Sequence, residues 1–270
     1  MNKIGNIYKM GVKLNNFSSI PNVEYSLPIN SEIIDMNIQI GNYINFTFLK
    51  EIHCIGCNRK ISKSFAQGYC YPCLINSPET SECILRPELC QAHEGIARDI
   101  DWAEQHCLQN HYVYLALSST IKVGVTRAEQ IPTRWIDQGA SQAIKFALTP
   151  NRYIAGLIEV EIKKYISDRT SWQKMLKNII NTKLDLHESK MELINKLPNE
   201  LKLYKDPNDE IINIVYPVEE YPTKIKSVGF DKFEEIHGKL SGIKGQYLIF
   251  DDGRVLNIRK HNGYKIQLEI

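Results

Sequence analysis

Residues 54–73, CIGCNRKISKSFAQGYCYPC, decide the fold of the first part of the chain. They hold two Cys-x2-Cys pairs, Cys54 with Cys57 and Cys70 with Cys73, separated by twelve residues. One such pair turns two sulfurs towards a common ion, and two pairs complete a tetrahedron of thiolates around Zn²⁺. Sites closed in this way stabilise a fold and leave no position for catalysis. The spacing predicts a structural zinc site in a zinc ribbon, with two redox or disulfide pairs as the alternative.

Residues 78–111 are rich in turns and contain further potential metal ligands. The candidates for a second zinc site are Cys83, Cys90 and His93, followed by His106, Cys107 or His111. The spacing does not decide between the last three, and we take His106 into the predicted set. Buried free thiols beside hydrogen-bonded histidines are the alternative. A hydrolytic zinc enzyme built on this site would keep one coordination position open.

The charge of the chain is nearly balanced. It has 270 residues, 33 of them basic and 31 acidic, and a formal net charge of +2, which excludes a strong overall field for nucleic acid or anionic membrane. Residues 51–111 hold five basic and eight acidic residues, 112–172 hold eight and five, and 223–270 hold nine and six. A polyanionic partner, DNA or RNA, would therefore meet the middle and C-terminal parts.

The sequence also favours a location. The N-terminus lacks the apolar core of a signal peptide, and nowhere do eighteen apolar residues run together. Seven cysteines, an odd number at metal-type spacing, fit a reducing compartment better than a disulfide scaffold. We therefore expect a cytoplasmic protein without a membrane partner.

Strands are predicted in three parts of the chain. Short alternating stretches mark residues 1–50, and the β-rich residues 112–126 turn at Ser118–Thr120 as a tight hairpin does. From about residue 224 the chain alternates again, and Asp252-Gly253 is a strong hairpin signal. Four or five short strands there predict a small β domain of the barrel or sandwich type.

Helices are predicted between these β regions. Apolar residues near helical spacing predict one helix over 132–148 and a second over 152–167. Further helices are expected over 171–203 with an interruption near Pro198, and the polar residues after them indicate a linker.

The central residues carry a more specific pattern. YVY at 112–114, KVGVT at 122–126, Arg134 and Glu159 follow one another on a strand, a second strand and two predicted helices. In this order they resemble the GIY-YIG endonuclease superfamily, in the branch whose second tyrosine motif becomes Lys-hydrophobic-Gly-x-Thr. Here Lys122 stands where most of the family has the second tyrosine.

The resemblance implies cleavage of phosphodiester bonds. Tyr114 would position or activate the attacking water, Lys122 and Arg134 would supply positive charge at the phosphate, and Glu159 would hold Mg²⁺ or Mn²⁺. Helical geometry does not separate Glu159 from Glu161, and only the family pattern favours the former. The alternatives are a core tyrosine, a surface arginine and a solvated glutamate.

A second resemblance extends over nearly the full length. The segments that carry it are GYCYPC at 68–73, RPELCQAHEG at 86–95, HYVYLALSSTIKVGVTR at 111–127, PTRWIDQGA at 132–140 and GIKGQYLIF at 242–250. They are similar to an uncharacterised bacterial family known only as a domain of unknown function, which implies one inherited architecture and no established activity.

The sequence thus predicts an α+β protein of five consecutive segments. These are an N-terminal β segment (1–50), a zinc-binding module (51–111), a GIY-YIG-like α/β domain (112–172), a helical segment with a linker (173–222) and a small C-terminal β domain (223–270). The leading hypothesis is a zinc-containing protein directed to nucleic acid and acting as a metal-dependent endonuclease. The alternative is a non-catalytic module on a degenerate nuclease scaffold that binds nucleic acid or a protein.

Overall fold

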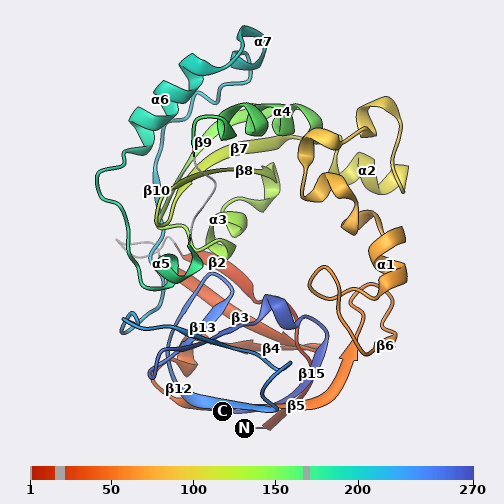
Figure 1. Ribbon diagram of the computed structural model, residues 1–270, viewed down its shortest axis with the longest axis vertical. Coiled ribbons are helices and arrows are strands. Elements are labelled where there is room, and N and C mark those ends of the chain that lie inside the picture. The colour runs from red at the N-terminus through yellow and green to blue at the C-terminus, as the bar shows by residue number, and fades with distance from the viewer. Residues whose placement is uncertain (1, 16–21, 167–170) are drawn as a thin grey trace. The chain divides into compact units, whose positions relative to one another are not determined.

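The structure, a computed structural model, is of mixed α+β type and describes residues 2–15, 22–166 and 171–270 (Figure 1). It divides into two compact units. Unit 1 comprises Met1–Ile75, Ile136–Gly139 and Ile214–Ile270, and unit 2 comprises Asn76–Trp135 and Ala140–Asn213. Both units are therefore assembled from separate stretches of the chain, whereas the five segments expected from the sequence follow one another.

Unit 1 contains two β-sheets whose strands are mostly antiparallel. Its strands are β1 (Asn2–Asn6), β2 (Gly11–Asn15), β3 (Asn22–Ile29), β4 (Glu32–Asp35), β5 (Tyr43–His53), β6 (Lys60–Ile61), β11 (Lys226–Val228), β12 (Glu235–Lys244), β13 (Tyr247–Phe250), β14 (Arg254–Asn257) and β15 (Tyr264–Glu269). The larger sheet has the order β1-β15-β5-β12-β13-β14-β11, with β6 paired to β5. The smaller has the order β2-β3-β4.

Strand β5 joins the two ends of the chain in one sheet. It pairs antiparallel with β12 on one side and β15 on the other. These partners cover both edges of β5, so the strand lies inside the sheet, and its Ile44 and Phe46 are completely buried. The sequence predicts separate β regions over 1–50 and 223–270, because alternation identifies a strand but does not name its partner.

The hairpin predicted at Asp252-Gly253 is confirmed. It joins β13 to β14, which pair antiparallel. Gly253 has a φ of +80°, and a Cβ atom there would lie 2.4 Å from the carbonyl oxygen of Lys224. Only glycine fits this turn without a shift of the neighbouring backbone.

Unit 2 is a four-stranded sheet with helices. The strands are β7 (His111–Leu117), β8 (Ile121–Arg127), β9 (Gln142–Thr149) and β10 (Ile212–Asn213), in the order β10-β9-β7-β8. The helices are α2 (Ile100–His106), α4 (Arg152–Lys163), α5 (Trp172–Leu176), α6 (Leu186–Lys196) and α7 (Asn199–Lys202). Two further helices, α1 (Tyr71–Asn76) and α3 (Thr133–Asp137), each end beyond a boundary between the units.

One face of this sheet packs on α4 and α6. The buried cluster joins alternate residues of β7 and β8 to residues of both helices; from these elements it contains Val113, Leu115, Leu117, Ile121, Val123, Ala155, Ile158, Ile162, Leu186, Leu193 and Ile194. The predicted hairpin at Ser118–Thr120 is confirmed as the connection of β7 to β8. Because side chains alternate along a strand, the intervening residues of β7 and β8 lie on the opposite face.

The helix predicted over 132–148 is wrong beyond its first turns. Helix α3 ends at Asp137, Gly139 adopts a φ of +70°, and residues 142–149 form β9. Ile144 and Phe146 of β9 are fully buried in the sheet core, so tertiary pairing with β7 outweighs a local pattern compatible with a helix.

The later helices agree better with the sequence. Helix α4 starts at Arg152 after Asn151, whose side chain accepts a hydrogen bond from the Ile154 amide, and it ends at Lys163; residue 167 of the prediction lies outside the described residues. The interruption near Pro198 is confirmed between α6 and α7. Residues 177–185 are not helical.

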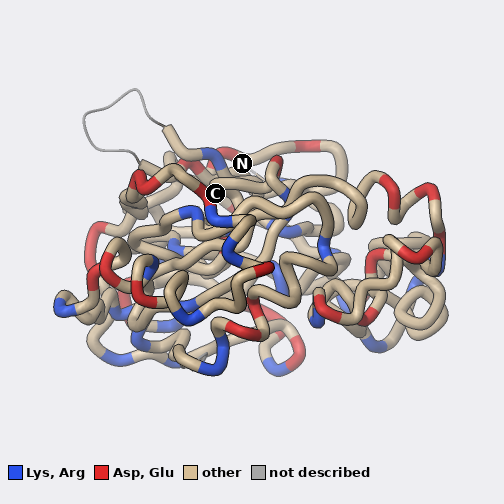
Figure 2. Tube along the Cα trace, turned by 90° about the horizontal axis from the view of Figure 1, so that it is seen from above, with Lys and Arg blue, Asp and Glu red and all other residues tan. Residues whose placement is uncertain are grey.

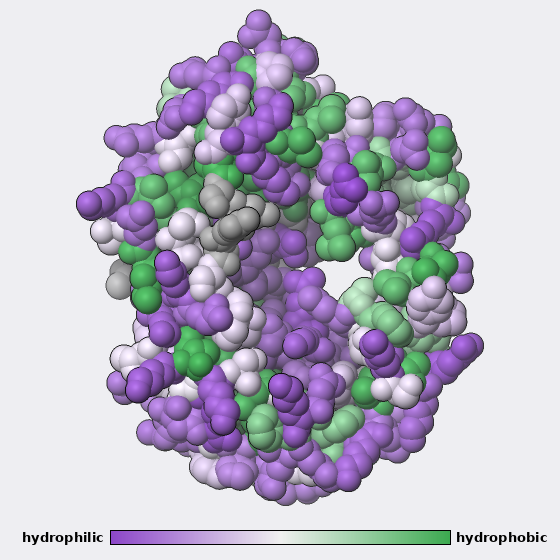
Figure 3. Space-filling model, in the orientation of Figure 1, coloured by the Kyte–Doolittle hydropathy of each residue, from purple (hydrophilic) through white to green (hydrophobic). Residues whose placement is uncertain are grey.

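No helix in the described ranges has the length and apolar content needed to cross a membrane. On the face drawn in Figure 3, hydrophobic residues form scattered patches among hydrophilic ones.

Candidate functional site

The first thiol cluster lies in unit 1, where β5 ends. Its four members, Cys54, Cys57, Cys70 and Cys73, place their sulfurs within 4.8 Å of one another. Cys54 follows β5 directly, and Cys70 immediately precedes α1, which carries Cys73. All seven cysteines of the chain are free thiols, so the disulfide alternative is not what the structure contains. The predicted set of four thiol ligands is thus brought together.

Backbone contacts hold the two Cys-x2-Cys turns against each other. The Ile55 amide donates to the Gly68 carbonyl at 2.9 Å. Gly68 has a φ of +144°, and a Cβ there would meet the Ile55 side chain at 2.8 Å, so a larger residue would separate the turns. Between the pairs lie the two-residue strand β6 and a bridge from Phe65 to Tyr69. The zinc ribbon class remains a prediction.

Amide groups point at the sulfurs, as they do around thiolates. The Cys70 amide lies 3.1 Å from the Cys54 sulfur and the Cys73 amide 3.5 Å from the Cys70 sulfur. Burial raises the pKa of Cys54, but backbone donors including Cys70 and Cys57 outweigh it and lower the pKa to about 6. The thiolate form of Cys54, which is the form that binds a metal, is therefore favoured near neutral pH, whereas hydrogen bonds with Cys70 and Cys57 raise the pKa of Cys73 to about 12.

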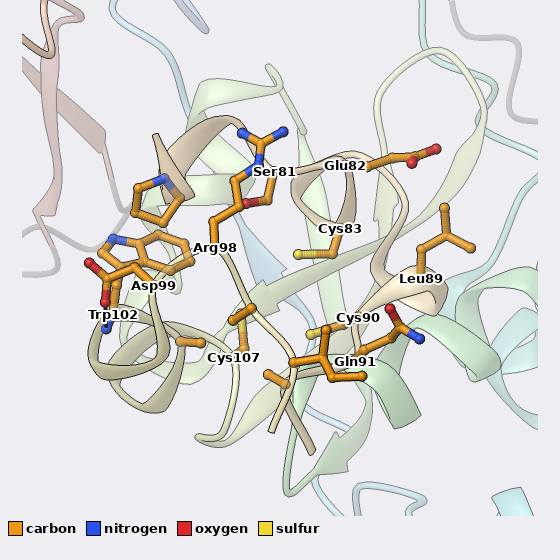
Figure 4. A pocket seen from close by; sticks show the side chains of 15 residues that line it. Ser81, Glu82, Cys83, Leu89, Cys90, Gln91, Arg98, Asp99, Trp102 and Cys107 are labelled. Atoms are coloured by element: carbon orange, nitrogen blue, oxygen red, sulfur yellow. Dashed lines mark hydrogen bonds between the residues drawn. The ribbon is translucent and has the colours of Figure 1, made fainter. Parts of the chain in front are cut away.

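A second thiol cluster lies in unit 2 and has three members. The sulfurs of Cys83, Cys90 and Cys107 are within 4.8 Å of one another (Figure 4). Cys83 and Cys90 come from short 3-10 turns at 82–84 and 87–89, and Cys107 caps the C-terminus of α2. Cys107, one of three choices for the fourth ligand in the sequence, thus stands beside the two predicted cysteines.

The predicted histidine ligands lie outside this group. His93 stacks on Tyr153 with ring centroids 4.3 Å apart. His106 stacks on Trp102 at 4.0 Å, and its Nδ1 is 2.8 Å from the Trp102 carbonyl oxygen. Among the described residues, three cysteine sulfurs lie within 4.8 Å of one another at this cluster, and no histidine nitrogen joins them within that distance.

His111, the third choice, is buried nearby. Its Nδ1 lies 2.7 Å from the Gln109 carbonyl oxygen, and its Nε2 has no hydrogen-bond partner within the described structure. Burial lowers the pKa of His111 to about 4, so the ring is neutral at pH 7.

A buried arginine accompanies the second cluster. Arg152, the first residue of α4, donates to the carbonyl oxygens of His106 at 3.0 Å and Cys83 at 3.5 Å. Hydrogen bonds with Cys83 and Cys90, followed by the charge of Arg152, lower the pKa of Cys107 to about 2. A cation beside thiolates offsets their mutual repulsion.

Gly156 brings the cluster onto α4. A Cβ atom at this position would lie 2.1 Å from the Glu88 amide nitrogen and 2.4 Å from the Pro87 carbonyl carbon. The turn at 87–89, which ends at Cys90, can therefore touch α4 only because residue 156 has no side chain.

Both donor sets are compatible with metal binding. Thiolates suit zinc and other soft or borderline ions. Four thiols can close a tetrahedron, whereas three leave one position to another donor.

The central sheet brings two of the predicted catalytic residues onto one face. Tyr114 of β7 and Lys122 of β8 both lie opposite the face that packs on α4. Tyr114 is paired with Gly124, where a Cβ would lie 2.5 Å from the phenol oxygen. The glycine of the KVGVT motif therefore makes room for the tyrosine ring.

Arg134 lies on α3, directly before a residue that contacts Tyr114. The next residue, Trp135, packs edge-on against Tyr114, with centroids 6.1 Å apart and an interplanar angle of 63°. Tyr114 itself is completely buried.

Glu159 is placed differently. It lies on α4, whose Ile158 and Ile162 cover the other face of the sheet. Its residue exposure is 7%, and its carboxylate is 3.3 Å from the Lys163 amine. The rival Glu161 pairs with Lys164 at 2.5 Å. Both pairs have the i,i+4 or i,i+3 spacing that brings charged side chains together on a helix.

A family model described as a protein of unknown function (DUF2797) matches residues 41–266. The chain belongs to the DUF2797 family. This confirms the predicted relationship to an uncharacterised domain family, and the DUF2797 match includes both thiol clusters and the central sheet. No curated protein and no solved structure matches the chain.

The sequence gives little sign of two residues that support the second thiol cluster, Arg152 and Gly156. Arg152 reads as an ordinary charged residue at a helix start, and nothing in its spacing connects it with Cys107. Gly156 offers a weak signal, because glycine inside a helical pattern often marks a close contact.

Proposed function

We propose that zinc fills both thiol clusters, that the chain acts on DNA or RNA, and that unit 2 cleaves phosphodiester bonds with Mg²⁺ or Mn²⁺. One observation carries the nuclease part. Tyr114 and Lys122 share a face of the sheet, and α3, which bears Arg134, packs on that tyrosine. Strand, strand, helix and helix then follow in the GIY-YIG-like order, with β9 inserted before α4.

The proposed roles follow from the chemistry of the side chains. Lys122 and Arg134 are cations that stabilise charge growing on a phosphate in the transition state. The phenol of Tyr114 orients or relays a proton of the attacking water. Glu159 would hold the divalent ion, which when bound polarises a phosphate oxygen and a water molecule.

Three features count against this function: Tyr114 is completely buried, helix α4 with Glu159 covers the sheet face opposite to Tyr114 and Lys122, and Glu159 is paired with Lys163. A carboxylate that is 7% exposed and 3.3 Å from an amine must exchange that partner before it binds an ion. This observation favours a second candidate, a non-catalytic module that binds nucleic acid on the sheet face of Tyr114 and Lys122. Figure 2 shows Lys and Arg interspersed with Asp and Glu, so either function relies on local groups and not on a strong overall field.

The test uses the full-length, zinc-loaded chain. Fluorescent single-stranded DNA, double-stranded DNA and RNA are incubated with Mg²⁺ or Mn²⁺, and products are separated by gel. We expect Glu159→Gln and Arg134→Ala each to lower the cleavage rate by about 100-fold or more. Glu161→Gln is the matched control on α4, and its rate should stay near that of the wild type.

Folding is checked with tryptophan fluorescence. Trp102, Trp135 and Trp172, the three tryptophans of the chain, all belong to unit 2, so their emission reports on the unit that carries the mutations. Cleavage that persists in both variants would show that these residues are not the site. Binding that weakens steeply with salt, without cleavage in either metal, would select the non-catalytic module.

A further inference from the structure

The second thiol cluster faces a pocket. A cavity of about 400 Å³ in unit 2 is lined by Cys83, Cys90 and Cys107 together with residues of 78–103 (Figure 4). The first cluster collects four sulfurs, whereas the second collects three, and no His, Asp or Glu of the described chain joins it within 4.8 Å.

The neighbouring histidines are engaged elsewhere or lie off the cavity. His93 and His106 stack on aromatic rings, and neither lines the pocket. His111 has an Nε2 without a hydrogen-bond partner in the described structure, but it too does not line the pocket. A fourth donor can therefore approach the three sulfurs most directly from the cavity side.

Charge permits an anionic fourth donor. Three thiolates and Zn²⁺ together carry one negative charge, which the buried guanidinium of Arg152 beside Cys107 offsets; the pocket lining adds the cation Arg98 and the carboxylates of Glu82 and Asp99. The two guanidinium groups thus reduce the repulsion that a further anion would meet from the thiolates and the carboxylates.

The pocket walls indicate which anion fits. They combine the apolar side chains of Leu89, Ile96 and Trp102 with the two carboxylates and the guanidinium named above. The carboxylates disfavour a further oxygen anion, the apolar side chains can contact the carbon atoms of a small organic ligand, and zinc accepts sulfur donors readily.

We infer that Cys83, Cys90 and Cys107 form a three-thiolate zinc site whose fourth coordination position opens into this pocket and binds the thiolate of a small thiol. The inference rests on zinc occupancy of the cluster and is independent of the proposed nuclease activity. On binding, the S–H bond of the thiol breaks, its proton passes to solvent, and the sulfur forms a bond to zinc. Nothing is oxidised or reduced.

The experiment counts sulfur ligands. The full chain, loaded with two zinc ions and kept reduced with a phosphine, is measured by zinc X-ray absorption with and without millimolar 2-mercaptoethanol. One four-sulfur and one three-sulfur site average about 3.5 sulfurs per ion, and occupation of the open position raises this to about 4. Ethylene glycol, the oxygen analogue of the probe, should leave the count unchanged.

Two variants locate the response. His111→Gln should keep the full gain in sulfur count, because the inferred site does not use that histidine. Cys107→Ser should abolish the gain, and tryptophan fluorescence checks that unit 2 remains folded.

Two results would overturn the inference. A count that stays near its starting value with thiol means that the fourth position is closed by the protein. A gain that appears only in His111→Gln means that His111 is the fourth ligand in the wild type, giving a closed structural site.

Discussion

The two thiol clusters are held together by different means. Cys54, Cys57, Cys70 and Cys73 come from one short stretch, and its own turns aim the sulfurs at one another. Cys83, Cys90 and Cys107 come from two 3-10 turns and a helix end, and these are held by Arg152 and Gly156 of α4. The first cluster is thus local, whereas the second depends on tertiary packing.

The two units also differ in what surrounds a buried cation. In unit 2 the guanidinium of Arg152 lies beside the thiol cluster. In unit 1 the amine of Lys244 lies over the rings of Tyr216 and Tyr221, with 5.1 and 5.3 Å to their centroids. Arg152 lies beside thiols that would be thiolates with a metal bound, whereas Lys244 lies over aromatic rings, so we expect mutation to affect the two units in opposite directions.

The largest effect is expected from Cys70→Ser in the local cluster. Removing one of four thiolates opens the site, and structural zinc sites contribute most of the folding energy of the loops around them. We expect the zinc content to fall from two ions per chain to one. Hydrogen exchange at the Ile55 amide, which bonds to Gly68, should accelerate by at least about 100-fold.

The matched control is Ser62→Ala, an exposed position between the two Cys-x2-Cys pairs. It should leave zinc content and exchange unchanged. Retention of two ions in Cys70→Ser would show that the four sulfurs do not form one site.

A smaller effect is expected from Gly156→Ala, which tests the dependence of the second cluster on packing. Alanine normally stabilises a helix relative to glycine by about 0.5 to 1 kcal/mol. Here its Cβ would meet the backbone of Glu88 at 2.1 Å, so we expect unit 2 to lose about 2 to 4 kcal/mol instead. Urea unfolding followed by tryptophan fluorescence measures this loss.

Val160→Ala, at a partly exposed position of α4, is the control and should change the free energy of unfolding by less than about 1 kcal/mol. The sign of the Gly156 effect is decisive. Stabilisation by alanine would mean that the turn at 87–89 does not rest on α4.

The same contrast explains what the sequence could predict. The spacing of Cys54 to Cys73 contains the whole first cluster, so its ligand set was predictable in full. Cys107 joins the second cluster through the end of α2, and no spacing rule separates it from His106 and His111. Strand β9 was missed for a related reason, since its pairing with β7 is a long-range contact that a helix-compatible local pattern does not reveal.

The next effect in size is expected from Arg152→Gln. Glutamine can still donate to a carbonyl oxygen, but it removes the positive charge beside the thiolates. Residues that support metal ligands typically change affinity by about 10- to 100-fold, so zinc should leave the second cluster that much faster. Transfer of zinc to a coloured chelator, recorded as two kinetic phases, measures both clusters at once.

The phase belonging to the four-thiol cluster should not change in this variant. Arg86→Gln serves as the control, because Arg86 lies near Cys83 and Cys90 in sequence but is largely exposed and pairs with Glu82 and Glu88. Equal rates of zinc release from the second cluster in the two variants would show that the charge of Arg152 does not stabilise zinc there.

The smallest effect, of opposite sign, is expected from Lys244→Met. Burial lowers the pKa of Lys244 from 10.5 to about 8, so at pH 7 the amine is charged in both states and the cost of burying it is fully present. Methionine removes this cost but also the attraction to the two rings, and we expect unit 1 to gain about 1 to 2 kcal/mol. Hydrogen exchange of β12 and β13 across a urea series measures the gain.

The pH dependence of the free energy of unfolding provides a second test of this prediction. Between pH 8 and 10.5 the unfolded state binds more protons at Lys244 than the folded state does, so the stability of the wild type rises with pH in that window. The advantage of Lys244→Met should therefore shrink over the same range. Lys239→Met, at an exposed position of β12, should show neither the gain nor its pH dependence. A loss of stability at pH 7 in Lys244→Met would mean that the aromatic rings stabilise the buried amine by more than its desolvation costs, and the two buried cations would then be alike.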